Sequence, residues 1–437
     1  MKIYKEFFRC VIPSMLAFAL SGVYAIADGF FVGNSLGDNA LAAINIAYPL
    51  TAFLQAVGTG IGMGGAVRYA ISEGTGNRRG SRQYFGMALV LLIAGSAVFT
   101  ALFLAGAPAA LRMFGAFGEI EQLAGTYIRY IAYGAVFQIL GTGLVPFIRN
   151  MGGAVAAMAA MIAGFATNIL LDYLFVWRLP YGMAGAAVAT VIGQAVTFGV
   201  CAAFLLVRRK APLFRFDGSG RTLLRGILKV GMSPFGLTFS PNITLILVNK
   251  SAVLFGGALA VTCYAPISYL SAVILLLLQG VSDGAQPLLS LYYGRGETKL
   301  VSRFRNLAYC FAGLTSLACM AVLLLTRRQA AALFGASAQV TGSVAEILPI
   351  FVSGYLFVAA SRVTTAYLYA TEKNLWAYVM IYGEVFFLFV LLLFLPEMAG
   401  ITGTWLAVPV SQLLAAAMSA AVVGRESGRT QTGECDR

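Results

Sequence analysis

Residues 182–207 read GMAGAAVATVIGQAVTFGVCAAFLLV, an apolar run that contains no charged residue. A helix needs about 20 such residues to cross the hydrocarbon core of a membrane, whereas a barrel strand needs about 10 of alternating polarity. In lipid every backbone N–H and C=O must be paired internally, so a span is a helix or belongs to a closed barrel. The length of this run therefore predicts a transmembrane helix.

The rest of the chain has the same character. Of its 437 residues, 59% are hydrophobic and only 11% are charged, whereas a soluble domain is typically about 25% charged. Polar, charged, glycine and proline residues divide the chain into twelve apolar spans, and we therefore predict an all-α integral membrane protein with twelve transmembrane helices. The spans are 9–33, 43–70, 84–106, 123–149, 154–177, 182–207, 228–254, 258–292, 303–325, 342–370, 375–396 and 400–423.

The first span follows basic residues, an arrangement that also begins a signal peptide. No cleavage site of the A-x-A type follows it, and Asp28 lies within the apolar run. We expect this segment to be retained as the first membrane helix.

Lysines and arginines are unevenly divided between the connecting segments. With the N-terminus placed inside, 22 of the 30 lysines and arginines lie in segments on that side, and four lie in the opposite loops. Cytoplasmic loops carry the excess of Lys and Arg, so both termini are predicted to face the cytoplasm. The net charge of +13 follows from this topology, and we expect no nucleic-acid partner.

The two halves of the chain resemble each other at a nearly constant offset. Each half holds six spans, so both halves enter the membrane from the same side and the repeat is parallel. We predict two six-helix bundles around a central cavity: residues 1–207 and 228–424, with a cytoplasmic linker at 208–227 and a tail at 425–437. At offsets of 218 to 221 residues, the matches are Pro13 and Pro234, Gly74 and Gly294, Gly76 and Gly296, Gly115 and Gly335, Gly182 and Gly400, and Gln194 and Gln412.

Acidic residues are rare inside the predicted spans, where an ionised group costs roughly 3 kcal/mol or more. Asp28 lies fifteen residues after Pro13 in the first span. Because proline bends a helix, we interpret Pro13 as a hinge that is coupled to a proton or cation at Asp28. The alternative is a solvated carboxylate at the outer end of the helix.

Asn168 and Asp172 are four residues apart, so they share one face of the fifth predicted helix. Together with Asp28 and the hydroxyl group of Thr190, they would form a set of hard oxygen ligands suited to Na⁺ or to a shared proton. The alternative is an ordinary hydrogen bond between helices at Asp172.

Other polar residues within spans are candidates for a substrate cavity. Gln279, Asp283 and Gln286 form a polar stripe at helical spacing, and Gln55 and Gln194 complete the predicted cavity residues. Arg362 and Glu384 lie in consecutive spans, and a structural salt bridge is the favoured interpretation for this pair.

Several chemistries are excluded by composition. The chain has no histidine, and its six cysteines form no CxxC motif, so we expect no metal cluster, no disulfide framework and no Cys-His or Ser-His nucleophile pair. No P-loop pattern occurs, so ATP is not the predicted energy source.

The order and spacing of several short runs resemble the multidrug and toxic compound extrusion (MATE) family over nearly the whole chain. No single run is specific, but their succession across twelve spans is. The runs are Asp28–Gly33, Ala40–Ala43 with Pro49, Gly74–Gly76, Asn168–Asp172, Gly182–Ala187 with Ala189 and Thr190, and Gln286–Gly294.

This resemblance implies a V-shaped pair of six-helix lobes in a bacterial inner membrane. It implies export of small, cationic, amphipathic compounds in exchange for H⁺ or Na⁺, without a bound cofactor. The cation-site roles carry over to Asp28, Asn168 and Asp172, a possible Na⁺ site, and also to Thr190. We expect a monomer and no enzymatic activity.

Two other functions are alternatives for a membrane protein of this kind. A flippase for lipid-linked saccharides has the same superfold, but it needs a strongly basic cavity, and few basic residues lie within the spans. A membrane prenyltransferase needs paired Asp-rich Mg²⁺ motifs, and only one Asn-x-x-x-Asp sequence is present within a span.

Overall fold

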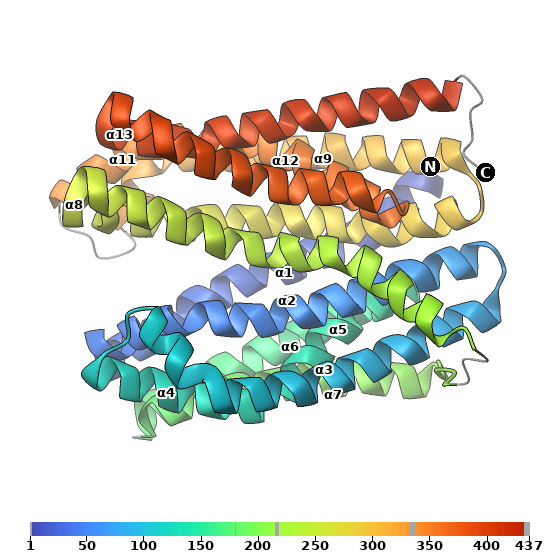
Figure 1. Cartoon of the computed structure of the whole chain (residues 1–437), viewed down its shortest axis with the longest axis horizontal. Helices are drawn as coiled ribbons and strands as arrows, with labels where there is room; N and C mark the ends of the chain where they lie inside the picture. Colours follow the sequence, from blue (N-terminus) through green and yellow to red (C-terminus); the bar gives the residue numbers. More distant parts are fainter. Residues whose placement is uncertain (1, 180, 215–217, 333–337, 432–437) are drawn as a thin grey trace. The chain divides into compact units, whose positions relative to one another are not determined.

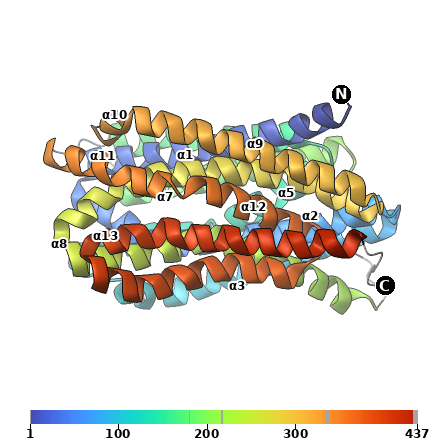
Figure 2. The same cartoon turned by 90° about the horizontal axis from the view of Figure 1, so that it is seen from above.

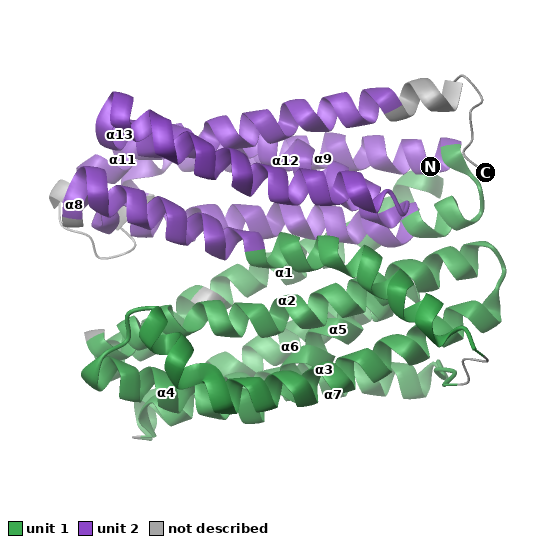
Figure 3. Cartoon of the chain, viewed as in Figure 1, with its two compact units in different colours: residues 1–239, 290–298 green, residues 240–289, 299–437 purple. Residues whose placement is uncertain are grey.

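The computed structural model describes residues 2–179, 181–214, 218–332 and 338–431, and this part of the chain contains helices and no strand (Figure 1). The prediction of an all-α membrane fold is confirmed. The helices fall into two compact units, which we call the N-terminal unit (residues 1–239 and 290–298) and the C-terminal unit (residues 240–289 and 299–437) (Figure 3).

The N-terminal unit is built from long helices that run side by side, as two perpendicular views show (Figures 1 and 2). In this unit α6 packs against α1 and α7, and α2 packs against α3 and α5. Its elements are α1 (Lys2–Leu36), α2 (Asp38–Gly74), α3 (Arg78–Met113), α4 (Gly118–Tyr133), α5 (Ala135–Asn150), α6 (Ala154–Asp172), the π-helical turn η1 (Tyr173–Arg178), α7 (Gly182–Val207) and the two ends of α8 (Gly220–Gly294).

The C-terminal unit contains the middle of α8 and the remaining helices. In this unit α13 packs against α12 and α11, and α10 packs against α11. Its further elements are α9 (Thr298–Leu325), α10 (Arg327–Ala332), α11 (Ala338–Val352), α12 (Tyr355–Ala370) and α13 (Asn374–Gln431).

Twelve membrane crossings follow from the lengths and bends of these helices. Nine helices in the described ranges are long and apolar enough to cross a membrane, and two bent pairs, α4 with α5 and α11 with α12, each form one further span. The segment Asn374–Arg425 has 52 residues and a break at Gly400. At about 1.5 Å per residue it is more than twice as long as the ~30 Å hydrocarbon core, so it crosses twice.

The internal repeat is visible in the backbone. Gly182 and Gly400 have φ angles of 57° and 58°, and Gly37 and Gly257, 220 residues apart, have φ angles of 84° and 64°. These are conformations that glycine adopts without strain. The bent pairs also correspond, with angles of 60° between α4 and α5 and 43° between α11 and α12.

Some boundaries differ from those predicted by hydropathy. Helix α8 begins at Gly220, within the segment 208–227 that was predicted to be a linker, and α13 continues to Gln431, beyond the predicted end of the bundle at 424. A helix pairs its own backbone groups in water as well as in lipid, so it continues past the apolar span into charged sequence. The repeat match at Gly335 lies outside the described residues.

Candidate functional site

Four residues predicted to bind the coupling cation come together inside the N-terminal unit, and we call them the oxygen cluster: Asp28 of α1, Asn168 and Asp172 of α6, and Thr190 of α7. The carboxyl groups of Asp28 and Asp172 are direct neighbours, within hydrogen-bonding reach of each other. The Asn168 Nδ2 atom donates to Thr190 Oγ1 at 3.4 Å.

Close packing of α6 against α7 brings Asn168 to Thr190. A Cβ atom at Gly164 would overlap Thr197 Oγ1 and lie 2.7 Å from the carbonyl oxygen of Gly193. Glycine at this position therefore lets the two backbones approach, as small residues commonly do between membrane helices.

The C-terminal ends of α1 and α6 are held together by aromatic side chains. Directly after Asp172 the chain forms the π-helical turn η1, and such turns are frequent at functional sites. Trp177 of this turn packs against Phe30 and Phe31 of α1, with ring centroids 6.1 and 6.0 Å away. These contacts fix α1 beside α6 two residues beyond Asp28.

The oxygen cluster is rich in acceptors and poor in donors. Asn168 and Asp172 are buried. Four buried oxygen atoms accept no hydrogen bond from any described residue: Asp28 Oδ1, Asn168 Oδ1 and both carboxylate oxygens of Asp172. A buried carboxylate without a partner is costly, so this arrangement favours a proton or a cation.

The ligand set suits a proton or a monovalent cation better than a divalent metal. Two carboxylates, one amide oxygen and one hydroxyl oxygen are available, and no group of three or more His, Cys, Asp or Glu side chains occurs among the described residues. Calcium sites commonly use six to eight oxygen ligands, often with several carboxylates.

Two tyrosines of the site were missed by sequence reasoning. The phenol groups of Tyr24 on α1 and Tyr127 on α4 lie beside Asp28 and Asp172, and both approach the hydroxyl group of Thr190. Tyr24 precedes Asp28 by four residues, so helical spacing is a signal that was present. Nothing in the sequence links Tyr127 to the cluster.

Pro13 lies within α1, which is continuous from Lys2 to Leu36. The next residue, Ser14, accepts a hydrogen bond from Nη1 of the buried Arg149 of α5 at 3.2 Å. The guanidinium group of Arg149 also lies over the ring of Phe18, 5.5 Å from its centroid. The predicted bending position is thus held by a polar contact to a neighbouring helix.

The five predicted cavity residues are divided between the two units. Gln55 is exposed on α2, and Gln194 is half-buried on α7 in the N-terminal unit. Gln279, Asp283 and Gln286 lie on α8 in the C-terminal unit, where the latter two are buried. A common cavity for these residues stays a prediction.

The polar stripe of α8 belongs to a network with α12. Gln279 Nε2 donates to Asp283 Oδ1 at 2.6 Å, and the hydroxyl of Tyr369 donates to the same oxygen at 3.2 Å. Arg362 Nη1 donates to Gln279 Oε1 at 3.3 Å, and its acidic neighbours are Glu384 and Asp283. Arg362 is therefore engaged with both α8 and α13.

Comparison with known proteins places most of the chain in one family. The MatE family profile matches residues 13–174 and again residues 234–395, an offset of 221 that agrees with the internal repeat. Among curated proteins, the chain is similar to the Multidrug export protein MepA of Staphylococcus haemolyticus (22% identical over 404 residues, 92% of this chain and 89% of that protein). It is also similar to MepA of Staphylococcus aureus (22% identical, 96% and 93% covered).

Solved structures share the fold. One is a multidrug resistance MATE family transporter in an outward-facing conformation (25% identical, TM-score 0.88, covering 98% of this chain and 96% of that chain). Another is a MOP superfamily transporter from Pyrococcus furiosus (24% identical, TM-score 0.90, 98% and 97% covered). With a family match over most of both halves, the chain belongs to the MatE family, whose members are multi-pass membrane transporters and not enzymes.

Proposed function

We propose that this transporter exports small, cationic, amphipathic compounds and drives their export by the uptake of H⁺ or Na⁺ at the oxygen cluster. The proposal deepens the family assignment by naming the substrate class and the coupling site. The observation that supports the proposal is the pair of neighbouring carboxylates, Asp28 and Asp172. Four oxygen atoms of the cluster accept no hydrogen bond within the described part of the chain.

The cluster has the chemistry that antiport requires. Two adjacent carboxylates in a buried site repel each other when both are ionised, so loading with positive charge is favoured. Neutralisation removes that repulsion and lets α1 change its packing around Pro13, which we propose as the bending position. A membrane potential that is negative inside favours entry of a cation by about 2.3 kcal/mol per charge per 100 mV.

The remaining parts of the proposal concern the setting. We propose that the protein lies in a bacterial inner membrane with both termini in the cytoplasm. The segments on the same side as the termini carry the excess of Lys and Arg, which is typical of the cytoplasmic side. We propose that the chain works as a monomer, without a cofactor, and that its partners are the bilayer, the coupling ion and small organic cations. The curated relatives with multidrug export names support this substrate class for the present chain.

The decisive experiment uses the purified protein in liposomes loaded with ethidium. An inwardly directed pH gradient and an inwardly directed Na⁺ gradient are imposed separately, at zero and at negative-inside potential. Export driven by one of the two gradients identifies the coupling ion. Absence of export under both gradients, with folded protein in the liposomes, would overturn the proposal.

A variant pair localises the coupling. Asp172→Asn is expected to abolish gradient-driven export, because one of the two carboxylates is lost. Glu119→Gln makes the same charge change at an exposed position at the start of α4 and is expected to transport like the wild type. Equal loss in both variants would show that the effect is not specific to the cluster.

A further inference from the structure

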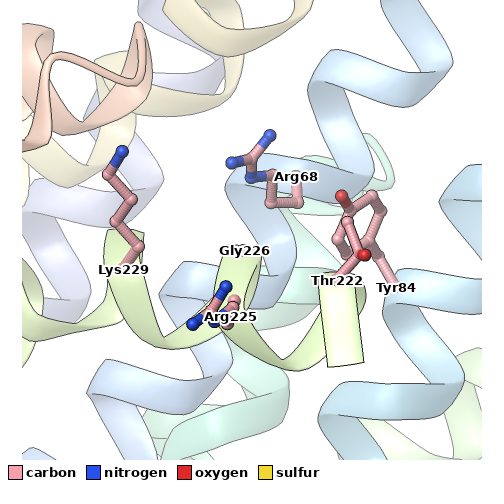
Figure 4. Close-up of a pocket in the computed structure, with 6 residues that line it drawn as sticks. All are labelled: Arg68, Tyr84, Thr222, Arg225, Gly226 and Lys229. Atoms are coloured by element: carbon pink, nitrogen blue, oxygen red, sulfur yellow. The ribbon is translucent and has the colours of Figure 1, made fainter. Parts of the chain in front are cut away.

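A basic pocket lies within the N-terminal unit, away from the oxygen cluster. It has a volume of about 270 Å³ and is formed by α2, α3 and the first turns of α8 (Figure 4). Figure 4 shows the side chains of Arg68, Arg225 and Lys229 around Gly226. Its lining residues are Arg68, Tyr84, Thr222, Arg225, Gly226 and Lys229.

All three helices contribute from the same end. Arg68 lies six residues before the end of α2 at Gly74, and Tyr84 lies six residues after the start of α3 at Arg78. Thr222 is in the first turn of α8. The pocket therefore lies near one end of the membrane spans, on the side that we propose to be cytoplasmic.

The pocket is chemically suited to a phosphate group. Its lining carries three positive charges and two hydroxyl groups, and none of the described lining residues is acidic. Guanidinium groups bind phosphate through paired N–H···O bonds, while a lysine ammonium group supplies a point charge. The Arg68 guanidinium also lies over the Tyr84 ring, 5.9 Å from its centroid, which fixes its position beside α3.

A glycine keeps the pocket open. A Cβ atom at Gly226 would lie 3.3 Å from Arg68 Nε and 3.4 Å from the Tyr84 hydroxyl. A larger side chain at this position would extend among the groups that line the pocket. A substitution at Gly226 can therefore fill the pocket without changing its charge. An experiment can use it to test the shape of the pocket separately from its positive charge.

Apolar side chains lie next to the basic ones on α8. Leu228 and Met232 follow Arg225 and Lys229 by three residues each, so they are neighbours on the helix surface, and they are 45% and 46% exposed. A basic site beside an exposed apolar stripe fits a ligand with an anionic head and an apolar tail. Basic pockets between membrane helices on the cytoplasmic side bind lipid headgroups in this way.

We infer that this pocket binds the phosphate of an anionic phospholipid, with the acyl chains along Leu228 and Met232. The bound headgroup bridges α2, α3 and the start of α8. This site is separate from the oxygen cluster, so its test does not depend on the proposed antiport.

The test measures stabilisation of the purified full-length protein in detergent. Dioctanoyl phosphatidylglycerol, dioctanoyl phosphatidylcholine and inorganic phosphate are titrated separately, and the half-saturating concentration is read from the rise in unfolding temperature. Phosphatidylglycerol is expected to saturate the wild type at the lowest concentration. Each basic contact near an anionic lipid contributes about 1 kcal/mol, so the double variant Arg225→Gln with Lys229→Gln should bind it roughly thirtyfold more weakly.

Two further variants make the outcome specific. Gly226→Leu should weaken phosphatidylglycerol binding with all charges retained, and it remains informative if the double variant does not fold. The control Arg208→Gln with Arg303→Gln makes the same charge change at two exposed positions outside the pocket and should bind like the wild type. Equal effects of the two lipids, saturation by inorganic phosphate at the same concentration as phosphatidylglycerol, or equal weakening in the control would each overturn the inference.

Discussion

Replacing Asp28 with asparagine removes one of the two neighbouring carboxylates of the oxygen cluster and keeps the size of the side chain. The variant is expected to lose coupling while retaining substrate binding, because the change affects charge and not shape. Asp28 lies within helix α1, and the substitution changes only its side chain, so the backbone hydrogen bonds of the helix are not altered.

The size of the effect follows from electrostatics. Two unit charges about 4 Å apart interact by roughly 4 kcal/mol at an effective dielectric constant of about 20. Asp28 and Asp172 are within hydrogen-bonding reach, so a repulsion of this order favours the uptake of one positive charge. Loss of one carboxylate removes this repulsion of roughly 4 kcal/mol. Because each 1.4 kcal/mol corresponds to a factor of about ten, the affinity of the cluster for the cation should fall by roughly a thousandfold.

The assay follows the cation directly. In weakly buffered detergent solution, the wild-type protein should release H⁺ when substrate binds, or release Na⁺ that a sodium-selective electrode detects, because the two ligands are negatively linked. Asp28→Asn should release neither, although its affinity for substrate in a direct binding assay stays close to that of the wild type. In liposomes the variant should carry substrate only down its own gradient.

The result that refutes this reasoning is equally direct. If Asp28→Asn accumulates substrate uphill at the wild-type rate and still releases the cation on substrate binding, the cluster is not the coupling site. Glu119→Gln serves as the control for a general effect of lost negative charge, because its side chain is exposed.

Three further predictions concern packing, buried charge and backbone conformation. Gly164→Val should force α6 and α7 apart, lower stability by about 1–3 kcal/mol as overpacking does, and reduce transport. Gly199→Ala should lower neither stability nor transport, because a Cβ atom there would meet no described atom within 4 Å apart from its own helix backbone. Arg362→Leu should destabilise the C-terminal unit by roughly 3–5 kcal/mol, because the buried Asp283 and the half-buried Glu384 lose the nearby positive charge. Arg362→Lys should restore part of the loss, and an unchanged unfolding temperature in the leucine variant would contradict this prediction. Gly400→Ala should cost about 1–3 kcal/mol, because φ 58° with ψ −141° is strained for alanine. Gly424→Ala in regular helix should not lower the unfolding temperature, because alanine favours a helix over glycine.

The prediction of twelve spans agrees with the structure because hydropathy is a local property. Each span must be apolar over its own length, and each backbone group must be paired within its own helix. The 182–207 span even has the predicted ends, because a glycine with φ 57° begins it and charged residues follow it. Helix also occurs outside the apolar sequence, because α8 begins within 208–227 and α13 continues past 424.

The candidate site was predicted in part. The four-residue spacing of Asn168 and Asp172 places them on one helix face whatever the fold, and the rarity of acids in lipid draws attention to Asp28. The same spacing relates Tyr24 to Asp28, but it was not used. Tyr127 could not have been found in this way, because it comes from a different helix.

What this sequence determines by itself is that the protein lies in lipid, how many times it crosses the membrane and that its two halves are duplicated, because these properties depend on runs and offsets along the chain. Only the tertiary structure decides which side chains meet. The pairing of Asp28 with Asp172, the engagement of Arg362 with Gln279 and the gathering of Arg68 with Arg225 each join residues from different helices. Such meetings depend on how each helix is rotated and how closely small residues let it approach its neighbour, and hydropathy carries no information about either.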